Sequence, residues 1–129
     1  MLYSGSVNEV WSFGEEAYPI LVKYMERRES MRPYVRELMH EAHEKGMPLM
    51  RGMFYEFPAD PVCVGIKDQY MLGSRCLVAP VMEAGARSRK LYLPADSSWR
   101  NVDTGETFEG GQWIDAPAPL DVIPGFERI

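Results

Sequence analysis

The sequence predicts an α+β chain in which a helical first part is followed by a part made of short antiparallel strands. Up to Gly46, apolar residues recur at intervals of three and four, which is the period of a helix face. Beyond Pro58 that period disappears, and turn residues separate short apolar runs instead. Two prolines in the segment Pro58–Pro61 mark the boundary between these two sequence patterns. We therefore expect a helix-rich piece over residues 1–57 and an antiparallel β-sandwich or barrel over residues 58–129.

The helical part is expected to begin at Ser12, because Ser12 and Glu15 have the spacing of a capping box. Pro19 and Pro33 both fall inside the apolar pattern that follows, and a proline inside a helix removes a donor and crowds the preceding turn. We expect two helices, or one helix with a kink near Pro33. Gly46 is expected to end the last helix, since glycine readily adopts the left-handed conformation of a helix C-terminus.

A buried strand is expected at Pro48–Phe57, an apolar run of strand length that contains one basic residue, Arg51. Turns rich in glycine, such as Gly110–Gly111, separate the strands expected after the boundary. These further strands are Gln69–Leu72, Cys76–Met82, Arg89–Leu93, Trp99–Val102, Gln112–Ala116 and Val122–Glu127.

Composition excludes several classes of function. A net charge of -5 without a basic block makes nucleic acid and anionic membranes poor partners. The uncharged run Cys76–Met82 is far shorter than the roughly 20 residues that cross a bilayer. The N-terminus lacks the basic start and long apolar stretch of a secretion signal. Cys63 and Cys76 belong to no metal or redox motif, so we expect buried thiols in a reduced, cytoplasmic protein.

No metal or nucleotide cofactor is expected. His40 and His43 lie three apart on the expected helix, whereas the metalloprotease motif needs histidines four apart with a glutamate between them. No third ligand cluster accompanies them. The glycines of the second half suit hairpin turns better than a loop that cradles phosphate.

Arg51 is the candidate site residue, because a guanidinium buried in an apolar strand requires a partner. An internal salt bridge, to Glu56 or to a helix glutamate, is the favoured interpretation, and direct contact with a substrate is the alternative. Four aromatic residues could stack on sugar rings, although a core position is the usual role of isolated aromatics. They are Trp11, Phe13, Trp99 and Trp113.

Ordered blocks run through nearly the whole chain: Asn8–Gly14, Met31–Tyr34, Glu41–Arg51, Phe54–Pro58, Asp68–Gly73, Leu77–Val81, Gly85–Pro94, Trp99–Gly111, Ala118–Leu120 and Ile123–Pro124. In this order they resemble the C-terminal part of family 31 glycoside hydrolases, the α-glucosidase and α-xylosidase family. The resemblance implies that residues 1–57 are the last helices and last strand of a (β/α)8 barrel. It implies that residues 58–129 are the proximal β-sandwich domain.

The family hydrolyses α-glycosidic bonds with retention, using one aspartate as nucleophile and another as acid/base. By the resemblance, both lie upstream of anything present in this chain. An independent count agrees, since no aspartate precedes Asp60. We therefore expect the chain alone to be inactive, and the whole enzyme to act on an α-linked glycoside without a cofactor. Two features depart from the family pattern: Gly52 stands where proline is usual, and the start MLYSGS suggests truncation or a shortened gene model.

The leading hypothesis is a part of a retaining exo-α-glycosidase that hydrolyses α-glucosides or α-xylosides. The alternatives are a non-catalytic carbohydrate-binding or interaction module, and an inactive truncated remnant. Under the leading hypothesis Arg51 supports the sugar pocket by holding a carboxylate, without a role in proton transfer. The open edges of the Pro48–Phe57 strand and the apolar helix face further predict association of the chain with a second copy.

Overall fold

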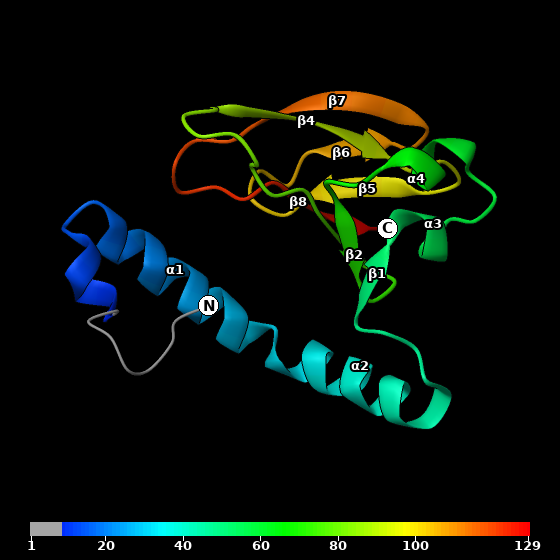
Figure 1. Cartoon of the computed structure of the whole chain (residues 1–129), viewed down its shortest axis with the longest axis horizontal. Coiled ribbons are helices and arrows are strands. Elements are labelled where there is room, and N and C mark those ends of the chain that lie inside the picture. Colours follow the sequence, from blue (N-terminus) through cyan, green and yellow to red (C-terminus); the bar gives the residue numbers. More distant parts are fainter. Residues whose placement is uncertain (1–8) are drawn as a thin grey trace. The chain divides into compact units, whose positions relative to one another are not determined.

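The computed structural model describes residues 9–129, so the start MLYSGS lies outside the described residues (Figure 1). The chain divides into two compact units, one that ends at Lys45 and one that runs from Gly46 to Ile129. Within residues 9–129, no helix combines the length and the apolar character that crossing a bilayer requires.

The first unit contains a short 3-10 helix η1 (Val10–Phe13) and two α-helices, α1 (Ala17–Ser30) and α2 (Arg32–Lys45). The expected division near Pro33 is present, and Pro33 is the second residue of α2, where its missing N–H would have had no intrahelical partner. Gly46 follows α2 with φ +68°, as expected for a helix end.

The expected capping box at Ser12 and Glu15 is wrong. Ser12 lies in η1, and α1 begins only at Ala17, after an N-cap residue, Glu16, whose side chain makes no capping bond. Gly14 lies between them with φ +89°, a conformation that no helix contains. The left-handed turn at Gly14 therefore separates Ser12 from the helix that it was expected to cap.

The second unit is an antiparallel β-sheet domain with two short helices. One sheet has six strands in the order β1-β2-β3-β8-β5-β6, and a second sheet is the ribbon β4-β7, which Figure 1 shows along the larger sheet. The strands are β1 (Met50–Gly52), β2 (Tyr70–Leu72), β3 (Cys76–Val78), β4 (Ser88–Leu93), β5 (Ser98–Asn101), β6 (Thr107–Glu109), β7 (Gln112–Pro117) and β8 (Gly125–Arg128). The short helices are α3 (Met53–Glu56) and α4 (Pro61–Gly65).

Side chains from both sheets form the core of this unit. Leu91 and Leu93 of β4 are fully buried, as are Trp99 of β5 and Phe126 of β8. Phe57, which follows α3, meets Trp99 edge to face with ring centroids 5.9 Å apart. Burial of each such large side chain contributes about 1.5–3 kcal/mol, so these contacts hold the ribbon against the larger sheet.

The strand expected over Pro48–Phe57 is mostly wrong. Only Met50–Gly52 is extended, and helix α3 begins directly afterwards at Met53. Within β1 only Arg51 is buried, whereas Met50 is 63% exposed. An apolar run does not distinguish a strand from a short helix by its period, and here the chain turns after three residues of pairing with β2.

Prolines shorten two of the other expected strands. β3 ends at Val78, before Pro80, and β8 begins at Gly125, directly after Pro124. A proline cannot donate to a strand ladder, so pairing stops beside it. Strand β6 was not among the strands expected from the residues, although the family resemblance implies a hairpin over Trp99–Gly111, and β5 and β6 form one. Helix α4 was not expected from the sequence.

Along the edge of β4 that does not face β7, side chains form hydrogen bonds with the strand's backbone. The Gln69 amide donates to the Tyr92 carbonyl at 2.7 Å and accepts from the Tyr92 N–H at 2.9 Å. The Arg89 guanidinium donates to the carbonyl of Lys90 farther along the same strand. Gln69 thus makes the pair of bonds that a neighbouring strand residue would make.

Candidate functional site

Arg51 lies at the centre of β1 and is 3% exposed. Its Nη1 donates to Oε2 of Glu56 at 2.9 Å, and its Nε donates to the carbonyl of Pro48 at 2.9 Å. The partner carboxylate comes from α3, five residues later, so the turn from β1 into α3 brings the two charges together. The sequence left a salt bridge or substrate contact open for Arg51, and the structure shows the salt bridge to Glu56.

A second arginine joins this pair from β8. Nη1 of Arg128 lies 3.9 Å from Oε1 of Glu56, and its Nε donates to Oγ of Ser97 at 2.7 Å. The Arg128 guanidinium also stands 5.2 Å from the ring centroid of Phe57, a cation–π distance. Glu56 therefore faces one guanidinium with each oxygen, and the cluster connects β1 and α3 to β8.

The two arginines of the cluster formed by Arg51, Glu56 and Arg128 cannot take part in proton transfer. A guanidinium stays charged at any working pH, so neither arginine can act as an acid or a base. The sequence indicated Arg51 and its partner Glu56 because they are close in the chain. Arg128 was not identified, since nothing in the sequence shows that β8 lies beside α3.

A second cluster surrounds Asp60, the half-buried N-cap residue of α4. One carboxylate oxygen accepts from the Val62 N–H at 3.0 Å, and the other accepts from the Tyr92 hydroxyl at 2.9 Å and the Ala95 N–H at 3.1 Å. Burial alone would raise the pKa of Asp60, but these hydrogen bonds together outweigh it and lower the pKa. Asp60 is therefore a charged acceptor that ties α4 to β4 and to the turn before β5.

Neighbours of Asp60 are held in their neutral forms. Burial, followed by the charge of Asp60, raises the pKa of the Cys63 thiol to about 12. Burial and the hydrogen bond to Asp60 raise the pKa of the Tyr92 hydroxyl to about 12. A thiol with such a pKa is a poor nucleophile at neutral pH, so this cluster is structural. Cys76 is half-buried and, like Cys63, forms no disulfide.

The two histidines belong to α2, in the first unit. Nε2 of His40 is 3.3 Å from a carboxylate oxygen of Glu44, and both side chains are mostly exposed. Within residues 9–129 no three histidine, cysteine, aspartate or glutamate side chains are placed to hold a metal ion together.

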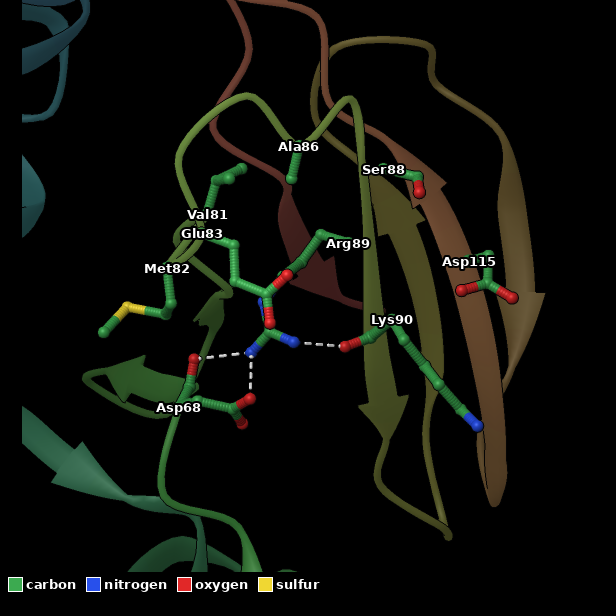
Figure 2. Close-up of a pocket in the computed structure, with 9 residues that line it drawn as sticks. All are labelled: Asp68, Val81, Met82, Glu83, Ala86, Ser88, Arg89, Lys90 and Asp115. Atoms are coloured by element: carbon green, nitrogen blue, oxygen red, sulfur yellow. Dashed lines mark hydrogen bonds and ion pairs between the residues drawn. The ribbon is translucent and has the colours of Figure 1, made fainter.

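A pocket of about 300 Å³ lies beside the start of β4 (Figure 2). Arg89 forms part of the pocket wall, and two contacts hold its guanidinium in place. Nη2 lies 2.7 Å from Oδ2 of Asp68, and Nε donates to the carbonyl of Pro80 at 3.0 Å. Glu83, Lys90 and Asp115 also line the pocket. This pocket was not expected from the sequence, because its walls come from segments far apart in the chain.

These features define an antiparallel β-sandwich-like domain whose buried charges connect its elements. The profile of the glycosyl hydrolase family 31 C-terminal domain matches residues 46–129. Alpha-glucosidase 2 of Bacillus thermoamyloliquefaciens is 37% identical over 118 residues, which covers 92% of this chain and 15% of that protein. The alpha-xylosidase of Saccharolobus solfataricus is 32% identical over 120 residues, covering 93% of this chain and 16% of that protein.

Solved structures of family 31 enzymes are also similar to this chain. A family 31 α-xylosidase from a soil metagenome, complexed with xylose, superposes with a TM-score of 0.93 at 49% identity, over 96% of this chain and 18% of that one. The Flavobacterium johnsoniae dextranase complexed with glucose has a TM-score of 0.91 at 36% identity, over 97% of this chain and 15% of that one. The chain belongs to glycoside hydrolase family 31, and it spans less than a fifth of the length of these relatives.

Replacing Arg51 with methionine should lower the free energy of unfolding by about 3–5 kcal/mol, because Glu56 would lose its buried partner. Arg51→Lys should recover only part of this loss, since an ammonium lacks the fixed fork of the guanidinium. Urea denaturation measures the effect. The matched control is Arg32→Met, which removes an exposed pair with Glu29 and should cost at most about 1 kcal/mol. Equal effects of Arg51→Met and Arg32→Met would contradict the assignment.

Asp60 should make stability depend on acid pH. Because its pKa is lowered on folding from the ordinary value of 3.8, its contribution is complete above that value and is lost as the pH falls through the folded pKa. Asp60→Asn should therefore be less stable than the parent at pH 7, and the difference should shrink near pH 3. Denaturation midpoints at the two pH values test this. Asp115→Asn, at an exposed position, is the control, and a difference for Asp60→Asn that does not change with pH would overturn the expectation.

Proposed function

We propose that this chain is part of a retaining exo-α-glycosidase that hydrolyses α-glucosides or α-xylosides. The observation that carries the proposal is the 49% identity, over 96% of the chain, to an α-xylosidase complexed with xylose. The relatives named α-glucosidase and α-xylosidase match over similar spans. The substrate of the whole enzyme would be an α-linked glycoside, with no cofactor. The two cysteines without disulfides suit a reduced, cytoplasmic location.

We further propose that residues 1–57 form the end of a (β/α)8 barrel and that residues 58–129 form the proximal β-sandwich. Two observations support the barrel origin. Among the described residues of α1 and α2, only Leu38 is buried, so these amphipathic helices leave most of their apolar stripe uncovered. β1 pairs with β2 on one side, and among the described strands none pairs with its other side. Further barrel helices and strands would cover both surfaces.

The chain is proposed to support the active site rather than to perform the chemistry. No aspartate precedes Asp60, and Asp60 accepts hydrogen bonds from groups of α4, β4 and the turn before β5. Arg51 acts as a positioning residue: it fixes the turn at the end of β1 through Glu56. In a (β/α)8 enzyme the C-terminal ends of the strands form the catalytic face, so the position of this turn would affect the sugar pocket.

A chimera tests the proposal. In the soil-metagenome α-xylosidase, the segment that matches this chain is replaced by residues 9–129 of this chain, and hydrolysis of an aryl α-xyloside is measured. The chimera should be active, whereas the 129-residue chain alone should not exceed a buffer blank. Arg51→Met in the chimera should lower kcat more than Arg32→Met does. A folded chimera without activity, or turnover by the isolated chain that a substitution in it abolishes, would refute the proposal.

A second copy of the chain is the proposed partner when the rest of the barrel is absent. Met25 of α1 and Met39 of α2 are 52% and 57% exposed, and exposed apolar surface of this kind favours association. Sedimentation equilibrium of the chain should show a concentration-dependent dimer. Met25→Glu with Met39→Glu should weaken it. Val64→Glu, at an exposed apolar position on α4, is the control. A monomer at every soluble concentration would rule out this partner.

A further inference from the structure

The structure separates the tryptophans that the sequence left as candidates for stacking on sugars. Trp99 is fully buried in the core, whereas Trp113 of β7 is 50% exposed. Trp113 lies directly across the ribbon from Tyr92, and their ring centroids are 5.3 Å apart with the planes tilted by 50°. Since Tyr92 is itself anchored by Asp60, Trp113 packs against a fixed neighbour. Trp113 thus offers apolar ring surface to solvent from a defined position.

Polar groups of both signs stand beside this ring. Lys90 pairs in register with Asp115, one step along the same face of the ribbon from Tyr92 and Trp113. Nζ of Lys90 lies 5.6 Å from the Trp113 ring centroid. Within residues 9–129, neither Lys90 nor Asp115 forms an ion pair. A donor and an acceptor therefore remain available next to the aromatic surface, and their charges cancel.

Lys90 and Asp115 also line the pocket beside β4. Figure 2 shows their side chains directed away from Arg89 and Asp68, so the Trp113 surface borders the pocket at these two residues. Ser88 adds a hydroxyl from the same strand, and Glu83 adds a carboxylate that has no hydrogen-bond donor within residues 9–129. Arg89 does not compete for a ligand, since its guanidinium is engaged by Asp68 and by backbone carbonyls. The volume, about 300 Å³, lies at the lower end of small-molecule sites.

We propose that the face of the β4-β7 ribbon that carries Lys90, Trp113 and Asp115 binds a neutral oligosaccharide, and that a sugar ring stacks on Trp113. A pyranose ring has an apolar face of C–H groups, which suits an indole ring, and a rim of hydroxyls that both donate and accept. Asp115 accepts from such hydroxyls and Lys90 donates to them. The charges of Lys90 and Asp115 cancel, and Glu83 adds one uncompensated negative charge, so an anion is disfavoured and a neutral ligand whose hydroxyls donate is favoured. The choice of α-linked glucose units as the sugar rests on the proposed function.

Calorimetric titration of the 129-residue chain with maltotriose and with isomaltotriose tests the site. Saturable binding in the millimolar range is expected for at least one of them. Trp113→Ala should weaken binding about tenfold or more, a change of about 1.4 kcal/mol or more. Asp115→Asn should weaken it by a smaller factor. Trp11→Ala removes another exposed tryptophan, 68% exposed on η1, and should leave the affinity unchanged. Thermal melts confirm that each variant is folded.

Two outcomes overturn the site: no saturable binding by the parent chain, or equal affinity of the parent and Trp113→Ala. Loss of binding in Trp11→Ala as well as in Trp113→Ala would also refute it, because the effect would not belong to β7. The titration requires no hydrolysis. Failure of the chimera would therefore refute the proposed function while leaving a positive binding result in place.

Discussion

The buried ion pair between Arg51 and Glu56 determines the course of the chain where it enters the β-sheet domain. A guanidinium that is 3% exposed loses nearly all its hydration, and only a close, well-oriented acceptor offsets that loss. Glu56 can reach Arg51 only if the chain leaves β1 after Gly52 and turns into α3. Arg128 then ties the same carboxylate to β8. The short strand, the helix after it and the contact with the far end of the domain all follow from satisfying one charge.

Three of the described carboxylates act as acceptors that join elements. Glu56 joins α3 to β1 and β8, Asp60 joins α4 to β4, and Asp68 holds Arg89 at the pocket wall. In each case the donors come from parts of the chain distant from the carboxylate or from the turn beside it. General acid and base chemistry needs carboxylates that face a substrate across a cleft, with their oxygens free to exchange protons. The arrangement of these three carboxylates suits the supporting role proposed above.

Local signals in the sequence were sufficient for much of the fold. Gly46, Pro33 and the hairpin glycines act through their own backbone preferences, so the break between the two helices, the end of the second helix and most strands could be predicted near their observed positions. The capping box predicted at Ser12 and Glu15 is absent because the left-handed turn at Gly14 separates Ser12 from α1. Helix α4 had a usable signal, since Asp60 followed by Pro61 is typical of a helix start.

Sites depended on information that the sequence does not contain. Arg51 and Glu56 are five residues apart, so their pairing could be anticipated, whereas Asp60 and Tyr92 are 32 residues apart and meet only through packing. The sequence alone does not distinguish the environments of Trp99 and Trp113. Which of them faces the core depends on the register of β5 and β7, and a shift of one residue would exchange inside and outside.

The side-chain closure of β4 has a consequence for solubility. An unpaired strand edge is a template on which further chains can add one after another, and such growth leads to fibrils. Gln69 makes the bonds of a strand residue with its amide, but it offers no further backbone groups for another strand to pair with. A further strand therefore cannot pair with Tyr92, because the Gln69 side chain already occupies its N–H and carbonyl. Closure by an amide gives Tyr92 the protection that a covering strand would give at that residue, without any additional length of chain to fold.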